Sequence, residues 1–210
     1  MAVETPHDIL YYKGGINNLS RQRFALDFNA PVILWMTVIS LAVLILDMVT
    51  NGSMVNFFAA YRTSLTDPMQ YIRVFTHVLV HADVAHYVAN FMMILAIGPV
   101  VEEKYGTRRL CIFIVITALI TGLIHVLFFP GVAVVGASGI VFMLILLASF
   151  TNIRQGMLPI TVPLVAVLYI GNEIMLGLFT VSNISRISHI IGGLCGAVAG
   201  TIYYARKIRP

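Results

Sequence analysis

The sequence predicts an all-α polytopic membrane protein, a bundle of six membrane-spanning helices. Hydrophobic residues make up 59% of the 210 residues and charged residues only 10%, with a mean hydropathy of +0.92. Soluble domains carry about 25% charged residues, so this composition is typical of a protein that lies in a bilayer. The apolar stretches are also long enough for helical spans, which take roughly 20 residues each.

The apolar stretches divide the chain into three parts. Residues 1–30 are polar and mixed in charge, and we expect them to form a cytoplasmic segment that leads into an uncleaved first span at Pro31, rather than a signal peptide. Residues 31–205 form the membrane domain, and residues 206–210 a short basic cytoplasmic tail. The six predicted spans are 31–49, 84–101, 109–128, 136–152, 158–178 and 186–205.

The basic residues predict the orientation of the bundle. With the N-terminus in the cytoplasm, ten lysines and arginines fall inside and only three fall outside, which follows the positive-inside rule. Both termini are then cytoplasmic. The three outside are Arg62, Arg73 and Arg186; the ten inside are Lys13, Arg21, Arg23, Lys104, Arg108, Arg109, Arg154, Arg206, Lys207 and Arg209.

The segment between the first two spans, roughly residues 50–83, is extracytoplasmic in this orientation. It mixes aromatic and apolar residues with few charges. A connection of that length and composition is expected to fold against the membrane rather than extend into water. Asp83 is placed to cap the second span, because its side chain can accept from the first free amides of the helix.

Three chemically active side chains fall at one depth in this topology. The second, fourth and sixth spans all run from outside to inside, and His86, Ser138 and His189 lie within their first few residues. An ionisable side chain in a span is costly and usually faces the bundle interior or a water-filled cavity. Taken singly, each histidine could simply make an interhelical hydrogen bond, and the small residues around Ser138 could serve helix packing alone.

Glycines at 192, 196 and 200 form a ladder of small residues along the sixth span, with His189 on nearly the same face. If the fourth span packs on this ladder, Ser138 and His189 meet. A serine hydroxyl beside a neutral imidazole is the minimum of an activated nucleophile.

Two further groups extend this arrangement. His86 and Asn90 share one helix face at i, i+4 spacing and can supply donors to an oxyanion. Phe142 lies one turn after Ser138, where its ring can hold the imidazole by stacking.

The ordered set of motifs closely resembles the rhomboid intramembrane serine proteases. The matches are G-A-S-G at 136–139, H-I-I-G-G-L-C-G at 189–196 and H-Y-V-A-N at 86–90. The resemblance implies a six-span rhomboid-like fold, with Ser138 as nucleophile and His189 as general base. It also implies an oxyanion and substrate-binding region formed by His86, Asn90, Gly136 and Phe142.

Other positions follow or depart from the family pattern. His77 and His81 match histidines found before the second span in bacterial members, and Glu102 and Gly106 match the family's E-x-x-x-G. The tryptophan-arginine pair of the family's first loop is here Ile72-Arg73. Phe142 stands where many members have tyrosine, which keeps the ring and loses the hydroxyl.

The function that the resemblance implies is cleavage of single-span membrane proteins near the outer face of a prokaryotic inner membrane. No cofactor, metal or nucleic acid is expected. One alternative is a non-catalytic rhomboid-like module that binds membrane proteins, although such relatives lack the serine or the histidine. Another is a small transporter or metal carrier, since imidazoles suit transition metals; its ligands would be His77, His81, His86 and His189.

Overall fold

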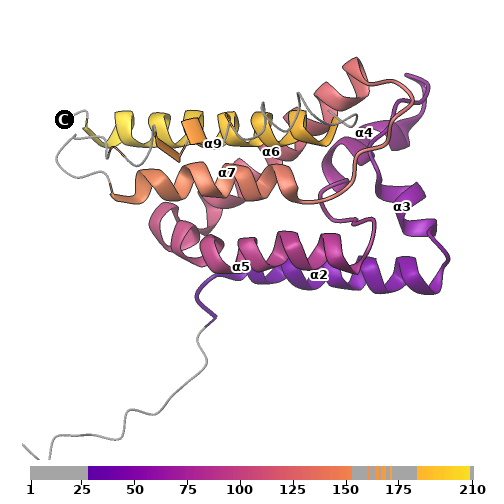
Figure 1. The fold of residues 1–210 in the computed structure, drawn as a ribbon, viewed down its shortest axis with the longest axis horizontal. Coiled ribbons are helices and arrows are strands. Elements are labelled where there is room, and N and C mark those ends of the chain that lie inside the picture. The colour runs from indigo at the N-terminus through magenta and orange to yellow at the C-terminus, as the bar shows by residue number, and fades with distance from the viewer. Residues whose placement is uncertain are drawn as a thin grey trace, which may run out of the picture.

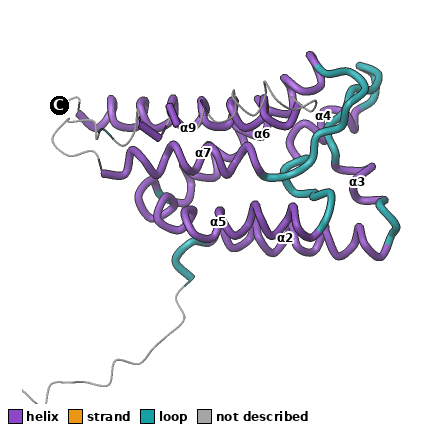
Figure 2. The backbone as a smooth tube through the Cα atoms, viewed as in Figure 1, coloured by secondary structure: helices purple, strands orange, loops and turns teal. Residues whose placement is uncertain are grey.

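A computed structural model describes residues 28–152, 160, 164–165, 167–168, 171 and 184–208. The regular secondary structure of the described residues is helical apart from one isolated β-bridge, and the main helices run side by side along the molecule (Figure 1). The main helices are α2 (Pro31–Val49), α5 (Val84–Tyr105), α6 (Thr107–Phe128), the shorter α7 (Ser138–Ser149) and α9 (Ile184–Ile208). Two short helices, α3 (Ser53–Phe58) and α4 (Pro68–Thr76), lie together at one end (Figure 2), and η1 (Phe150–Asn152) is a single 3-10 turn after α7.

The all-α membrane bundle is confirmed, and most predicted spans have a matching helix. Four helices are long and apolar enough to cross a bilayer: α2, α5, α6 and the Arg186–Arg206 part of α9. The predicted span 158–178 lies almost entirely outside the described residues, as does most of residues 1–30. The second span continues to Tyr105, four residues beyond its predicted end, and stops where Gly106 adopts a φ of 83°.

Helix α7 is central and unusually short. It packs against α5, α6 and α9 (Figure 1). Most of its side chains are buried. Its 12 residues rise about 18 Å, whereas the hydrocarbon core of a bilayer is about 30 Å thick. The predicted span 136–152 begins two residues before α7, because Gly136 has a φ of 105° and turns the chain into the helix, and its last three residues form η1. Ser138 thus begins a helix inside the bundle rather than at the bundle's edge.

The glycine ladder of α9 packs on α7, as the sequence predicts. A Cβ atom on Gly192 would collide with the Gly139 carbonyl, and one on Gly196 with the Met143 carbonyl. A Cβ atom on Gly200 would approach the Phe150 ring to 2.7 Å. Since the first two obstacles are backbone atoms, only glycine allows the helices to come this close.

A buried carboxylate joins α5 to the start of α2. The Glu102 oxygens accept hydrogen bonds from the backbone N–H groups of Val32 and Ile33, both at 3.1 Å, and Glu102 is 2% exposed. These amides lie in the first turn of α2, where an intrahelical acceptor is lacking, and negative charge is favourable there. The α2 N-cap residue, Ala30, makes no side-chain cap of its own.

The segment between α2 and α5 is folded, as predicted, and Arg73 holds much of it together. The Arg73 guanidinium donates to the Phe57 carbonyl at 3.2 Å, pairs with Asp67 at 3.4 Å and lies 4.5 Å from the centroid of the Tyr61 ring. Ile72 beside it is 47% exposed. The loop is thus anchored through the arginine, without the tryptophan that the family pattern has at this position.

Candidate active site

The turn that leads into α7 is held by two backbone hydrogen bonds. The Gly136 N–H donates to the His77 carbonyl at 2.9 Å, and the Ala137 N–H donates to His81 Nε2 at 3.2 Å. Gly136 is required for two reasons: its φ of 105° suits glycine, and a Cβ atom there would lie 2.5 Å from Cε1 of His86. The residues just before Ser138 are therefore positioned by the chain around the start of α5.

His77 and His81 are buried supports of this turn. His77 places Nδ1 3.0 Å from the Val74 carbonyl and Nε2 3.3 Å from the Thr121 hydroxyl. Burial lowers the pKa of each histidine from 6.5 to about 4, so both rings are neutral at physiological pH. His81 Nε2 accepts a hydrogen bond from the Ala137 N–H, so the neutral ring carries its own hydrogen on Nδ1.

Ser138 is half-buried and is the first residue of α7. The first intrahelical bond runs from the Val141 N–H to the Ala137 carbonyl at 3.0 Å. The N–H groups of Ser138, Gly139 and Ile140 therefore precede the intrahelical ladder and point out of the helix end. This end carries the positive pole of the helix dipole, which favours negative charge developing beside the serine.

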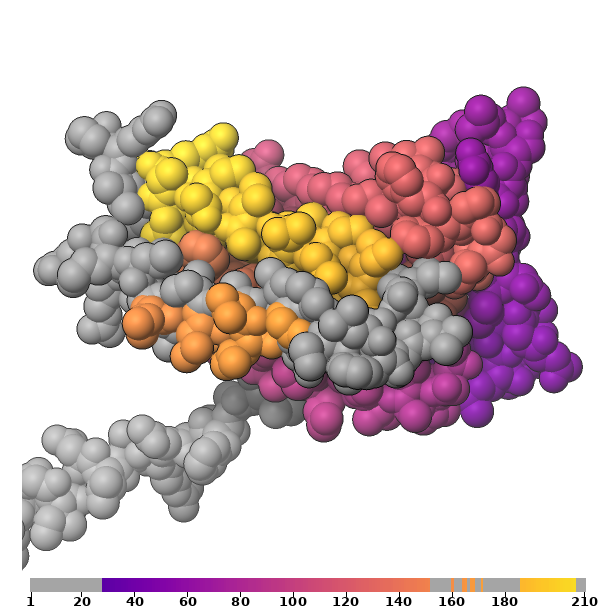
Figure 3. Space-filling model, turned by 45° about the horizontal axis from the view of Figure 1, so that its top comes forward, coloured from indigo at the N-terminus to yellow at the C-terminus, as the bar shows by residue number. Residues whose placement is uncertain are grey.

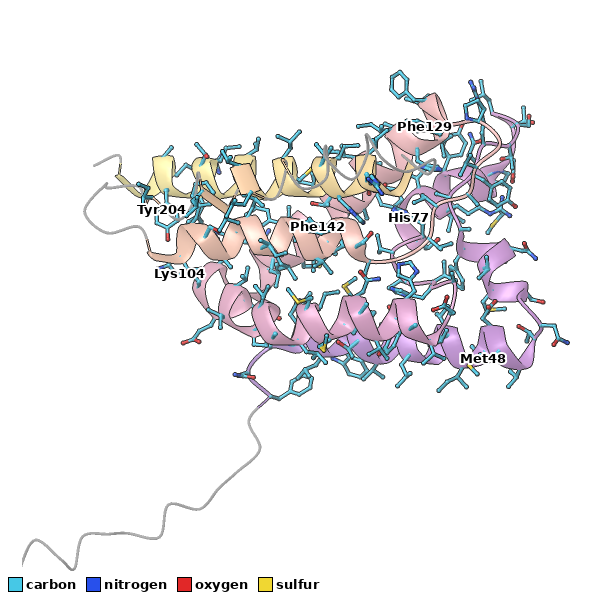
Figure 4. All side chains as sticks on the ribbon, in the orientation of Figure 1. Met48, His77, Lys104, Phe129, Phe142 and Tyr204 are labelled. Carbon is cyan, nitrogen blue, oxygen red and sulfur yellow. The ribbon has the colours of Figure 1, made fainter. Side chains whose placement is uncertain are left out.

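His189 of α9 lies against α7, one turn along from Ser138. Its ring centroid is 4.6 Å from that of Phe142, with the two planes at 42° (Figure 4 labels Phe142). The ring contact that the spacing predicts is present. Within the described part of the chain, the Ser138 hydroxyl makes no hydrogen bond to His189. Catalytic hydrogen bonds are often long or open without substrate and tighten when it binds.

His86 and Asn90 lie on the α5 side of the same turn. The His86 ring faces Gly136 and lies 5.1 Å, centroid to centroid, from the ring of His81. The Asn90 amide donates to the His86 carbonyl at 2.9 Å, and Asn90 is 6% exposed. One of the two N–H donors of this amide is thus used within its own helix. Asp83 caps α5 as predicted, accepting from the His86 N–H at 2.7 Å.

Residues 68–206 match the rhomboid domain. The chain belongs to the rhomboid family. It is 31% identical over 151 residues to the rhomboid protease GluP of Bacillus subtilis, a match that covers 70% of this chain and 29% of GluP. It is 27% identical over 208 residues to the rhomboid protease GlpG of Yersinia pestis, a match that covers 93% of this chain and 74% of GlpG. The matched part thus spans less than a third of GluP and about three quarters of GlpG.

In this rhomboid chain the contacts among the motifs come from four separate segments. The start of α7 meets the chain before α5, α5 itself and α9, and these contacts place His86 beside Gly136 and His189 beside Phe142. Among the described residues, no three His, Cys, Asp or Glu side chains lie close enough together to hold a metal ion. The bond from Ala137 to His81 was not predicted from the sequence, although His81 matches a histidine of the bacterial members.

Proposed function

We propose that this rhomboid chain is an intramembrane serine endopeptidase with Ser138 as nucleophile and His189 as general base. The main support is the position of Ser138, which starts a short helix in the middle of the bundle while the neighbouring helix carries His189 to the next turn. The names of the relatives, rhomboid proteases both, agree with a protease. The free amides at the start of α7, next to Ser138, support a role in binding an oxyanion.

The proposed reaction needs only side chains of this chain and water. His189 takes the hydroxyl proton of Ser138 as the serine oxygen attacks the peptide carbonyl carbon. The oxyanion so formed is stabilised by the amides at the α7 N-terminus, with His86 and Asn90 as side-chain donors; each such donor is worth roughly 3 kcal/mol. His189 then gives the proton to the leaving amine, and an acyl-enzyme remains. His189 then takes a proton from water as the water attacks the ester, and returns that proton to the serine oxygen as the ester bond breaks.

The proposed substrates are single-span membrane proteins. A peptide bond within a helix is shielded, since its carbonyl is already hydrogen-bonded, so the substrate must unwind before Ser138 can attack. Spans with weak helical character near their outer end are the best substrates on this account. The corresponding location is a prokaryotic inner membrane, with both termini of this chain and its short basic tail in the cytoplasm.

The test is cleavage of a single-span model substrate by the purified chain in liposomes. Wild type should cleave, and Ser138→Ala, His189→Ala and the double variant should all be inactive to the same degree, because the two groups act as a unit. Ser149→Ala is a matched control: this serine lies at the far end of α7 and bonds to the Ile145 carbonyl at 3.0 Å. It should retain activity.

Three results would contradict the proposal. Appreciable proteolysis by Ser138→Ala would remove the nucleophile from its role. Loss of wild-type activity in EDTA, restored by zinc, would favour a metal mechanism instead. A module that only binds membrane spans would retain the substrate uncut in wild type and in the Ser138→Ala variant alike.

A further inference from the structure

A long groove runs between α6 and α9 on the surface of the bundle. Its volume is about 1190 Å³, and its walls are largely apolar. In Figure 3 the two helices lie side by side, α9 in yellow and α6 in rose. The walls include Ile112, Ile116 and Ile120 from α6, and Leu194, Val198 and Ile202 from α9. A groove with such walls suits hydrocarbon.

One end of this α6–α9 groove is strongly basic. Arg108 and Arg109 reach it from the first turn of α6, and Arg206 from the last turns of α9. Arg109 lies over the Tyr203 ring, 5.5 Å from its centroid, and donates to the Tyr105 carbonyl at 3.2 Å. The described lining contains three arginines and no acidic residue. This end lies opposite the end that carries α3 and α4, on the predicted cytoplasmic side (Figure 1).

The start of α6 adds to the positive charge at this end. The cap residue Gly106 has no side chain to satisfy the helix amides, and the first intrahelical bond runs from the Leu110 N–H to the Gly106 carbonyl at 3.1 Å. The preceding N–H groups therefore face the same end as the arginines. Guanidinium groups and helix N-terminal amides are the two donor types that bind phosphate best in proteins.

We propose that the α6–α9 groove binds one anionic glycerophospholipid from the leaflet at its basic end. The phosphate lies among Arg108, Arg109 and Arg206, and the acyl chains lie along the isoleucine and leucine walls. Basic pockets between membrane helices on the cytoplasmic side are a recognised way of holding anionic headgroups. A helical span of another protein fits less well, because its apolar side chains would leave three guanidinium groups without a counter-charge. A zwitterionic lipid would bring its own positive group to the same end.

The bound lipid would also hold α9 in place. The groove face of this helix carries Leu194, Val198 and Ile202, whereas Gly192 and Gly196 pack on α7. Lipid in the groove therefore holds α9 in its place on α7 from the opposite side. A ligand that binds only the folded state raises its stability by mass action. The site is separate from Ser138 and His189, so its test does not depend on proteolysis.

The experiment measures lipid retained by the full chain in dodecyl maltoside, by native mass spectrometry, together with the thermal unfolding midpoint. Added phosphatidylglycerol should be retained as one molecule and raise the midpoint by several degrees; phosphatidylcholine should do neither. Arg108→Gln and Arg206→Gln should each weaken phosphatidylglycerol binding about fivefold, the effect of one surface cation. Lys104→Gln removes a charge at the same end but outside the groove, and should bind as wild type does.

A second pair of variants tests the apolar part. Val198→Trp fills the groove with all arginines intact and should abolish retention, while Ile45→Trp, at an exposed site on α2, should not. Equal retention of the two lipids, or unchanged binding by both arginine variants, would overturn the proposal. So would retention by Val198→Trp. Equal stabilisation by glycerol 3-phosphate would show a site for a soluble anion and contradict a lipid.

Discussion

At the scale of single residues, the structure assigns a supporting role to a buried histidine. His81 is fully buried, and its Nε2 accepts the N–H of Ala137, the residue directly before Ser138. This bond fixes the chain at the entrance to α7. The requirement is a neutral ring, because a protonated Nε2 cannot accept a hydrogen bond.

Replacing His81 by phenylalanine should destabilise the protein. The aromatic ring is kept, but the buried Ala137 N–H loses its acceptor, which costs about 1–3 kcal/mol. For a chain of this length each kcal/mol corresponds to about 2–4 °C in the unfolding midpoint. Thermal unfolding in detergent measures the loss. His81→Gln restores an acceptor and should recover part of it; equal midpoints for wild type and His81→Phe would show that the bond does not matter.

The two buried histidines also predict how stability depends on pH. The folded-state pKa of about 4 for His77 and His81 lies below the 6.5 of the unfolded chain, because burial disfavours the charged ring. Between these values the unfolded state binds more protons, so stability rises with pH and is lost as pH falls from about 6.5 towards 4. The unfolding midpoint, measured across this range, should fall less steeply for His81→Phe than for wild type. Parallel slopes would contradict the assignment.

Contacts between residues were predictable from the sequence only where the helical repeat places the residues on one face. The i, i+4 step from Ser138 to Phe142 and the ladder beginning at Gly192 predict that His189 meets α7, and the Phe142–His189 contact is present. The bond between Ala137 and His81 joins positions 56 residues apart. No periodicity links the two, so this contact required the structure.

At the scale of elements, the contact between α7 and α9 is set by backbone atoms. A side chain at Gly196 would meet the carbonyl of Met143, which cannot rotate aside as a side chain can. The helices must separate to admit it. Misplacement of about 1 Å at a reacting centre can lower a rate on the order of a hundredfold.

Gly196→Val should therefore lose most proteolytic activity although it bears no chemistry, and should unfold at a lower temperature. Ala205→Val makes the same kind of change at an exposed position of α9 and should behave as wild type. Turnover and unfolding midpoints of both variants provide the comparison. If Gly196→Val turned over substrate as fast as wild type, close packing of these helices would not be needed to position His189.

The bond between α5 and α2 offers a second test at this scale. Glu102→Gln replaces a charged acceptor of two helix amides by a neutral amide, and hydrogen bonds to charged groups contribute about 1.5–3 kcal/mol. A lower unfolding midpoint is expected. Glu103→Gln is the matched control, because Glu103 is exposed. Similar midpoints for the two variants would exclude a structural role for the Glu102 bond.

The length of the apolar stretches predicted where the helices lie, but predicted their first and last residues less well. Hydropathy located the helices that became α2, α5, α6 and α9, whereas α7 begins later than predicted because Gly136 turns the chain first. The short helices α3 and α4 were not predicted individually. Helices of this length are marginal alone and form through tertiary contacts, such as those of Arg73.

At the scale of the whole molecule, composition predicts the fold class, and the distribution of charge predicts the orientation. Few charges and long apolar runs predict a helical membrane bundle, and the described helices confirm it. The orientation remains a prediction from the placement of lysines and arginines. In the proposed function it also decides on which side of the membrane substrates are cut, because Ser138 begins α7 next to the chain that follows α4.

Labelling of single cysteines tests this orientation, in a background with Cys111 and Cys195 replaced by serine. A cysteine at Pro130, exposed between α6 and α7, should react with an impermeant maleimide on intact cells. A cysteine at Thr107, exposed at the other end of α6, should react only after lysis. The reverse pattern would place both termini and the basic end of the α6–α9 groove outside the cell.

The most direct measurement of the central claim is the site at which a fluorophosphonate modifies the purified chain. Such a reagent reacts with a serine whose hydroxyl is activated by a neighbouring base, and ordinary serines are inert to it. Peptide mass spectrometry should find a single adduct, at Ser138, and the adduct should be lost in His189→Ala while that variant remains folded. No adduct on the wild-type chain, or an equal yield of adduct in His189→Ala, would contradict the account of Ser138 and His189 as a catalytic pair.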